Sequence, residues 1–230
     1  MAGRIAYYGG IVTNGLVLAL DAAKKDSYPG SGTVWRDISG NGYNGTLTNG
    51  PTFNSNNGGS IVFDGTNDYC SIQDISITNQ ITIDSWVYAN SLGSYNAILS
   101  QWRANTTSLS CFVLETVGSD IRLYIGSGSN LYFASTPFTT GAWRHVVGTY
   151  DGTTVRIYLN TVLGLTTANP PSINNSSLNI NVGALYNSGG TEGSDGLWNG
   201  RISQIKYYNR ALSATEILQN YNATKGRYGL

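Results

Sequence analysis

WRHVVGTYDGTTVRIYLN, the stretch from Trp143 to Asn160, specifies a local structure almost by itself. Two runs rich in Val, Ile, Thr, Tyr and Trp flank Asp151-Gly152, and residues of these kinds favour β-strands. An Asp-Gly pair tolerates the positive φ angles that a tight two-residue turn requires. The stretch therefore predicts a β-hairpin in which Tyr150 faces Thr153.

The side chains of this hairpin divide into two faces, because opposed residues of an antiparallel pair share a face. One face is apolar and is predicted to be core. The other mixes aromatic, basic and apolar groups, which suits either a partly covered sheet face or a binding surface. The predicted core face holds Val146, Gly148, Val155, Ile157 and Leu159, and the mixed face holds Trp143, His145, Val147, Arg156 and Tyr158.

Further strand-like runs lie on both sides of the hairpin, separated by Gly, Asn, Ser and Pro at the short spacing typical of a β-sandwich. Near the end, Ser213 and Glu216 make a capping box, which predicts a short helix over 214–222. We therefore expect an all-β domain of two antiparallel sheets with one short C-terminal helix. The strand-like runs are 15–22, 46–48, 60–72, 81–89, 97–103, 110–117, 121–126, 130–135, 177–185 and 200–208.

The composition is typical of exported or virion β proteins. Only 11% of the 230 residues are charged and 29 are glycine, so the surface must be polar through Asn, Ser and Thr. The 13 basic and 13 acidic side chains cancel, which leaves no positive field for a phosphate backbone and argues against nucleic acid. The start is no secretory signal, and no run approaches the ~20 apolar residues that span a bilayer, so we expect no membrane insertion.

Cys70 and Cys111 each lie inside a strand-like run, where a thiol is usually a small apolar filler. A disulfide between them would need neighbouring strands in the right register, and the residues leave both states open. A C-x-x-C pattern for a metal is absent.

Four motifs in order carry a resemblance to a known family: FDGTNDY, ITIDSWVYA, WRHVVGTYDGTTVRIYLN and YNRALSATEI. The chain resembles the concanavalin A-like, laminin-G-like jelly rolls over roughly residues 15–221. The resemblance implies two antiparallel sheets packed face to face. Family members bind sugars or proteins, often with calcium, and some are glycosidases.

The two ends carry a narrower resemblance. GLVLALDAAKKDSYPGSGTVWRDISGNGYNG near the start and YNRALSATEILQNYNATKGRYGL at the end are similar to structural proteins of tailed bacteriophages that consist of this domain alone. We expect an N-terminal arm over 1–14, a laminin-G-like sandwich over 15–224 and a tail over 225–230. The resemblance implies a virion protein for capsid decoration, tail or fibre, and the alternative is an extracellular, lectin-like carbohydrate-binding module.

The acidic residues do not form the catalytic pair of a glycosidase. Enzymes of this fold place two carboxylates on one strand face, one as acid and one as nucleophile. Glu115 has no acidic neighbour two or four residues along, Glu192 lies in a glycine-rich loop, and Glu216 belongs to the helix cap. His145 is the only histidine and has no nucleophile motif beside it. We therefore expect no catalytic residues and a protein that is not an enzyme.

Calcium is the one cofactor that the loops suit, since it takes oxygen ligands from carboxylates, amides and carbonyls. Relatives often carry an acidic pair in the final strand, where this chain has Ser203-Gln204. The other interpretation is that these loop residues only make turn hydrogen bonds, so that no cofactor is required. The candidate calcium ligands are Asp64, Asn67 and Asp68, with Asp37 and Asn41 as alternatives.

A bound glycan would stack its rings on exposed aromatic faces. The sequence does not show which aromatic residues are exposed, because most of them lie in the core of a sandwich. The candidates are Tyr95, Trp102, Tyr186 and Trp198, together with Trp143 and Tyr158 of the hairpin.

The N-terminal arm is predicted to dock on another chain, because it is too apolar for water and too irregular for a core strand. A segment that orders on binding can wrap a partner. We expect other virion proteins, further copies of the chain in a trimer, and a host-surface glycan as partners. The arm residues assigned to this contact are Arg4, Ile5, Tyr7, Tyr8, Ile11 and Val12.

Overall fold

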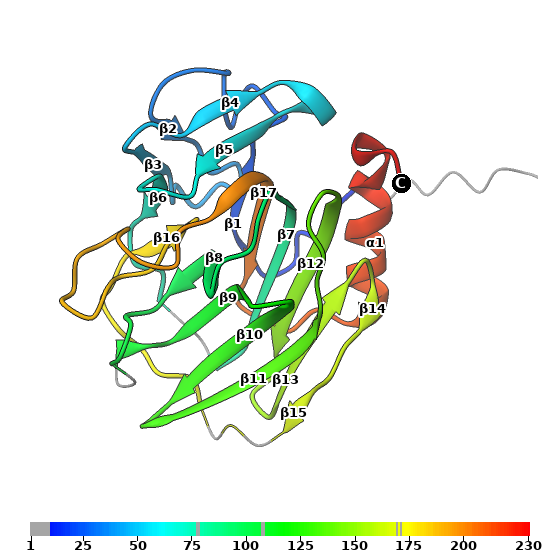
Figure 1. The fold of residues 1–230 in the computed structure, drawn as a ribbon. Coiled ribbons are helices and arrows are strands. Elements are labelled where there is room, and N and C mark those ends of the chain that lie inside the picture. Colours follow the sequence, from blue (N-terminus) through cyan, green and yellow to red (C-terminus); the bar gives the residue numbers. More distant parts are fainter. Residues whose placement is uncertain (1–9, 77–78, 107–108, 169, 171) are drawn as a thin grey trace, which may run out of the picture.

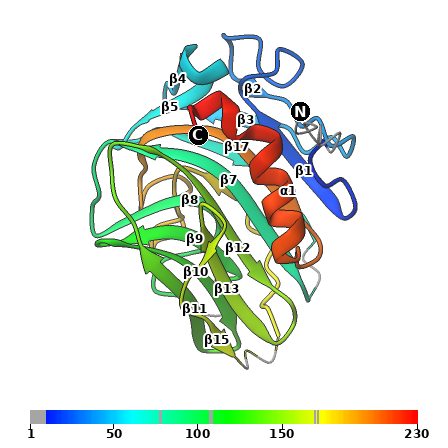
Figure 2. The same ribbon diagram turned by 90° about the vertical axis from the view of Figure 1, so that its right-hand side faces the viewer.

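Two antiparallel β-sheets pack face to face in this chain (Figure 1). The computed structural model describes residues 10–230 apart from 77–78, 107–108, 169 and 171. A short C-terminal helix lies on the outer side of one sheet, which we call sheet A (Figure 2). The predicted two-sheet sandwich with one short C-terminal helix is confirmed.

The chain crosses between the two sheets several times. Sheet A has the order β14 (Val162–Leu163), β13 (Thr154–Leu159), β12 (Trp143–Tyr150), β7 (Ile81–Ala89), β17 (Asn199–Tyr208), β5 (Ser60–Asp64) and β4 (Thr52–Asn54), with β1 (Leu16–Asp21) paired to β17 and β15 (Thr167–Ala168) to β13. Sheet B has the order β11 (Asn130–Pro137), β10 (Asp120–Ser127), β9 (Phe112–Val117), β8 (Tyr95–Gln101), β16 (Ile180–Val182), β6 (Tyr69–Ile72), β3 (Gly45–Thr48) and β2 (Val34–Trp35). Strands β8–β11 and β12–β15 each form a consecutive run within one sheet. The helices are η1 (Asn56–Gly58), α1 (Ala214–Thr224) and η3 (Lys225–Tyr228).

The core fills the space between the inner faces of the two sheets. Leu123 on β10 belongs to the same buried cluster as Val146 and Ile157 of the hairpin. Gly148 allows this close packing, because a Cβ atom there would lie 2.9 Å from a Leu123 methyl carbon. Complete burial of a side chain the size of leucine contributes about 1.5–3 kcal/mol.

The hairpin forms as predicted, but with a longer loop. Tyr150 lies opposite Val155 rather than Thr153. The carboxylate of Asp151 accepts the backbone N–H groups of Thr153 at 2.9 Å and Thr154 at 2.8 Å, which closes a wider turn. The predicted pairing is therefore wrong by two residues, and a shift of two leaves both predicted faces intact.

Helix α1 covers the mixed face of the hairpin. The predicted capping box of Ser213 and Glu216 is present, and the helix runs two residues further than expected. Ile217 packs with Val147 and Tyr158 on the outer side of sheet A. The mixed face is thus a covered sheet face rather than a binding surface. None of the helices in the part of the chain described has the length and apolarity to cross a bilayer.

A buried polar network joins α1 to sheet A. Asp84 on β7 lies 3.1 Å from both His145 Nε2 and Lys206 Nζ, and it accepts a 2.7 Å hydrogen bond from Asn220 of the helix. Burial disfavours the charged carboxylate, but Lys206 and His145 outweigh it and hold the pKa of Asp84 well below its usual value. The network fixes the helix on the sheet through one charged centre.

The N-terminal segment packs on this same surface of its own domain. Val12 is buried beside Ile217, its N–H donates to Asn220 at 2.8 Å, and its carbonyl accepts from the Tyr208 hydroxyl at 2.9 Å. Val12 therefore has its contact within the chain, which corrects its assignment to a partner-binding arm. Ile11 is half-buried at a cavity described below. The other predicted arm residues lie outside the described part: Arg4, Ile5, Tyr7 and Tyr8.

The C-terminal tail is also part of the domain. The Tyr228 ring stacks on Trp86, with centroids 4.0 Å apart, and Arg227 donates to both carboxylate oxygens of Asp21 at 2.9 Å. The residues of the predicted tail that these contacts involve are therefore held on the domain itself.

Cys70 and Cys111 are both buried and unpaired. Burial raises the pKa of Cys111 to about 11, so its thiol stays protonated at neutral pH. Both thiols act as small core groups.

Candidate functional site

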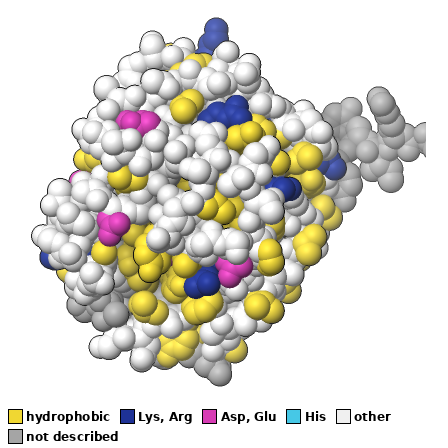
Figure 3. Space-filling model, viewed as in Figure 1, with side chains coloured by type: hydrophobic (Ala, Val, Ile, Leu, Met, Phe, Trp, Pro, Cys, Tyr) yellow, Lys and Arg dark blue, Asp and Glu magenta, His cyan; other side chains and the backbone are white. Residues whose placement is uncertain are grey.

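The outer face of sheet B presents polar and aromatic side chains along β8, β9, β10 and β11. The register places Ala97 and Arg122 on either side of Glu115, and Tyr124 opposite Phe133. Opposed residues share a face, so these side chains form one surface. Strands β9 and β10 lie toward the viewer in Figure 1, and the same view in Figure 3 shows few charged groups among hydrophobic and polar ones.

Glu115 is buried in the middle of this face. Glu115 is only 6% exposed, and its Oε2 has no hydrogen-bond partner within the described residues. Burial raises the pKa of Glu115 to about 7, while the charge of Arg122 lowers it and that of Asp195 raises it further. Near neutral pH both protonation states are populated, so the group can donate or accept a hydrogen bond.

Aromatic rings form a platform beside Glu115, which we define as Trp102, Tyr124 and Phe133. The Tyr124 centroid lies 5.0 Å from that of Phe133 and 6.0 Å from that of Trp102. The Arg122 guanidinium carbon lies 4.9 Å from the Phe133 centroid, and Nη1 donates to the Tyr124 hydroxyl at 2.8 Å. Phe133 is 39% exposed, so part of the platform is open to solvent.

The segment 183–198 folds over the same face from the other side. Leu185 packs with Ala97 and Val113, and its backbone pairs with that of Asp195. This segment brings the Asp195 charge near Glu115. This acidic neighbour is not evident from the sequence, because Asp195 lies far from Glu115 along the chain and not two or four positions away on the same strand.

The four aromatic glycan candidates fall into two environments. Tyr95 is 56% exposed at the start of β8, and Trp102 is half-buried beside Tyr124. Trp198 is 1% exposed and Tyr186 is 7% exposed, so neither ring presents a face to solvent. The structure thus corrects the assignment of Trp198 and Tyr186 and brings Tyr95 and Trp102 onto the face that holds Glu115. The hairpin candidates Trp143 and Tyr158 are buried beneath the C-terminal elements.

Arg122, Tyr124 and Phe133 were not predicted as site residues, although the sequence carries a signal for them. In IRLYIG the side chains of Arg122 and Tyr124 alternate with buried apolar residues, and such alternation places them on the face away from the core. The proximity of Trp102 to this strand depends on tertiary packing and leaves no local signal.

The candidate calcium ligands make turn hydrogen bonds in this structure. Asp64 Oδ1 accepts the N–H of Thr66 at 2.7 Å, and Asp68 Oδ2 accepts the N–H of Asp64 at 3.1 Å. The carbonyl of Asn67 accepts from Asn49 at 2.9 Å. Backbone hydrogen bonds lower the pKa of Asp64, whereas burial raises that of Asp68. No three His, Cys, Asp or Glu residues of the described ranges gather as metal ligands.

The alternative pair of calcium ligands pins the first long loop to β1. The Asp37 carboxylate accepts the backbone N–H groups of Ala19 at 2.9 Å and Ser39 at 2.8 Å. Asn41 Nδ2 donates to the carbonyl of Val17 at 2.9 Å. These bonds account for both side chains as loop anchors.

The face around Glu115 suits a ligand with both hydroxyl groups and apolar CH groups. Exposed aromatic rings supply flat stacking surfaces, and the carboxyl and guanidinium groups supply hydrogen bonds of fixed direction. Binding sites commonly combine a mainly apolar wall with a few polar groups of this kind.

Comparison with known proteins agrees with this fold. The family model described as the concanavalin A-like lectin/glucanases superfamily matches residues 64–218, more than half of the chain. No curated protein matches the sequence.

Several solved structures have the same fold at low sequence identity. Domain 4 of an extracellular arabinanase from Geobacillus stearothermophilus, in complex with arabinotriose, has a TM-score of 0.69 at 19% identity and matches 88% of this chain and 96% of its own. The binding domain of botulinum neurotoxin DC has a TM-score of 0.70 at 12% identity in complex with SialylT, matching 92% of this chain and 52% of the toxin chain. In complex with rat synaptotagmin II it scores 0.71 at 13% identity, matching 93% and 52%. This chain therefore spans about half the length of those toxin domains.

Proposed function

Because the chain belongs to the concanavalin A-like lectin/glucanases superfamily, we propose that it is a non-enzymatic binding domain that holds a glycan on the outer face of sheet B. One observation carries the proposal: the buried Glu115, whose Oε2 has no hydrogen-bond partner among the residues described, lies on the same face as the exposed rings of Tyr95 and Phe133. A sugar stacks its CH face on an aromatic ring while its hydroxyls bind the polar groups beside the ring. The arabinanase domain, which shares the fold over nearly its whole length, is in complex with an arabinose oligosaccharide and supports this ligand class.

The glycan proposal predicts that binding depends on the exposed rings. A glycan array probed with wild type should give signals that fall several-fold in Tyr95→Ala and Phe133→Ala, because a stacked aromatic contributes about 0.5–1.5 kcal/mol to such contacts. Leu218→Ala is the matched control, since Leu218 is 44% exposed on α1 beside the other sheet. Equal signals from all four proteins would refute the assignment of this face.

The absence of catalysis is part of the same proposal. Wild type incubated with the polysaccharides that bind on the array should release no reducing sugar. Release that disappears in Glu115→Gln would instead make Glu115 a catalytic acid, with Asp195 as the second carboxylate.

We place this binding domain on a tailed bacteriophage particle, as capsid decoration or as a tail or fibre component. Support comes from the resemblance of the two ends of the sequence to single-domain virion proteins. An apolar strip at the junction of the two sheets suits protein contacts with further copies or other virion proteins, because exposed apolar patches mark interaction sites. The strip consists of Leu131, Val162, Leu163 and Leu165, which are 43%, 69%, 49% and 74% exposed. A secreted, lectin-like module remains the second candidate, supported by the same glycan face.

The virion placement predicts a separable attachment segment. Deletion of residues 2–9 should leave the thermal midpoint unchanged, because Val12 keeps its contacts to the helix, and should abolish attachment to particles. Quantitative mass spectrometry of purified particles gives the occupancy. Tyr95→Ala serves as control and should keep full occupancy. Wild-type occupancy of the truncated chain would show that residues 2–9 are not the attachment segment, and a chain absent from particles altogether would favour the secreted module.

A further inference from the structure

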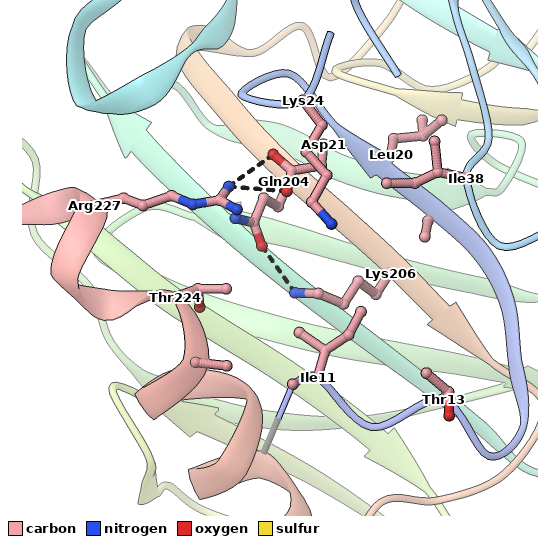
Figure 4. A pocket seen from close by; sticks show the side chains of 13 residues that line it. Ile11, Thr13, Leu20, Asp21, Lys24, Ile38, Gln204, Lys206, Thr224 and Arg227 are labelled. Atoms are coloured by element: carbon pink, nitrogen blue, oxygen red, sulfur yellow. Dashed lines mark hydrogen bonds and ion pairs between the residues drawn. The ribbon is translucent and has the colours of Figure 1, made fainter. Parts of the chain in front are cut away.

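A cavity of about 310 Å³ lies on the outer side of sheet A, between β1, β17 and the end of α1 (Figure 4). Ile11, Ala19 and Ile38 supply apolar wall, and Lys24, Gln204 and Arg227 supply polar groups. It lies on the opposite sheet from Glu115, so it is separate from the glycan face. Its volume is at the lower end of the range for small-molecule sites, about 300–1,000 Å³.

Lys206 fixes the orientation of the Gln204 side-chain amide. Gln204 is 1% exposed, and its Oε1 accepts a 3.0 Å hydrogen bond from Lys206 Nζ. An ammonium group only donates hydrogen bonds, so the amide oxygen must face Lys206 and the NH₂ group must point the other way. This NH₂ group has no acceptor among the residues that the structure describes. A buried donor without an acceptor is unfavourable, which makes the site attractive to an oxygen ligand.

The charges around the cavity favour an anion. Arg227 is held by both oxygens of Asp21, and Lys206 is balanced by Asp84 at 3.1 Å. Lys24 adds a further positive charge, and Figure 4 shows its side chain directed toward the same space as those of Gln204, Lys206 and Arg227.

Two carbonyls near the end of α1 are already paired. The carbonyl of Tyr221 accepts from the N–H of Lys225, and that of Asn220 accepts from the Thr224 hydroxyl at 2.8 Å. The cavity therefore offers donors and positive charge next to an apolar wall.

We propose that this cavity binds a small organic carboxylate. One carboxylate oxygen accepts the hydrogen bond from Gln204 Nε2, Lys24 provides the counter-charge at the mouth, and a short aliphatic body packs on Ile11, Ala19 and Ile38. Because Gly10 and Ile11 form part of the wall, a bound ligand also stabilises the N-terminal segment against the domain.

Hexanoate is the probe, with hexanol and inorganic phosphate as partial analogues that keep only the apolar body or only the negative charge. Calorimetric titration of the full chain should show binding of hexanoate and at least tenfold weaker binding of either analogue. In a ¹H–¹⁵N spectrum hexanoate should shift the side-chain NH₂ signals of Gln204, which are assigned by their absence in Gln204→Met. Gln204→Met should lower the affinity at least tenfold, since a charge-assisted hydrogen bond is lost.

Two exposed lysines give a matched pair that leaves the folded core untouched. Lys24→Ala should weaken hexanoate binding several-fold, whereas Lys25→Ala, one residue outside the lining, should leave it unchanged. Equal effects of the two variants, or hexanoate binding that leaves the Gln204 signals in place, would overturn the proposal. Hexanoate binding that appears only after deletion of residues 2–9 would also overturn the proposal, because that segment would then be the occupant of the cavity in the full chain.

Discussion

Glu115 shows at the scale of single residues how burial sets the behaviour of a titratable group. Its carboxyl group has a pKa of about 7 in the folded chain against a usual value of 4.5. Between these two pH values the folded chain therefore binds more protons than the unfolded chain. The contribution of Glu115 to stability is fully present below about pH 4.5 and is lost as the pH rises through 7.

The variant Glu115→Gln should lack this pH dependence. Wild type should lose up to about 3 kcal/mol of unfolding free energy from this group between pH 4.5 and pH 8, and the variant should not. Urea unfolding at several pH values measures the difference. Glu216→Gln is the contrasting control, because Arg210 holds the pKa of Glu216 at about 2, so that its contribution is lost toward acid. Parallel curves for wild type and Glu115→Gln would contradict the assigned pKa.

For some single residues the sequence alone indicates whether the side chain points into the core or away from it. Alternation in β10 identified which residues leave the core, so Arg122 and Tyr124 were predictable as surface residues. The burial of Trp198 was not, because it depends on the path of the segment 183–198 over sheet B. Aromatic identity alone does not distinguish a core ring from a binding ring.

Helix α1 is the element whose attachment depends on few contacts. Asn220 joins three partners: it donates to Asp84 and to the Tyr208 hydroxyl, and it accepts from the N–H of Val12. Because all these groups are buried, its loss would deprive the Val12 N–H and one carboxylate oxygen of Asp84 of the hydrogen bonds that Asn220 supplies.

Asn220→Ala should therefore lower the unfolding free energy by about 2–4 kcal/mol and speed amide exchange at Val12. Urea unfolding and hydrogen exchange measure the two effects. Gln219→Ala is the control on the same helix, since its side chain is half-buried and donates only to the carbonyl of Gly10; it should stay within about 0.5 kcal/mol of wild type. If both variants have the stability of wild type, the network does not hold the helix.

The helix was predictable as an element but its role was not. The capping box of Ser213 and Glu216 is a local signal, and it is present as expected. The mixed composition of the hairpin face did not reveal whether another element covers it, and the structure shows that α1 does. The turn at Asp151 differed from expectation because its carboxylate binds two backbone N–H groups, which an Asp-Gly pair alone does not reveal.

At the scale of the whole molecule, the strand periods and the order of the motifs sufficed to predict two sheets. The pairing across the molecule did not follow from them: β5 and β6 are adjacent in sequence yet lie in different sheets. The contacts of Val12 and Tyr228 could not be predicted from the sequence either, because each of these residues packs on residues far away in the chain. Such pairings depend on tertiary geometry, for which a local pattern carries no information.

The packing of the C-terminal end and of the segment from Gly10 onward against sheet A has a practical consequence. Gly10 lies against α1, and η3 packs beside Trp86 on the same side of the domain. Anything joined to the C-terminus, whether a fusion partner, an affinity tag or a sensor chip, therefore begins on the side away from sheet B. An immobilised chain should present its Glu115 face outward from the support without further engineering.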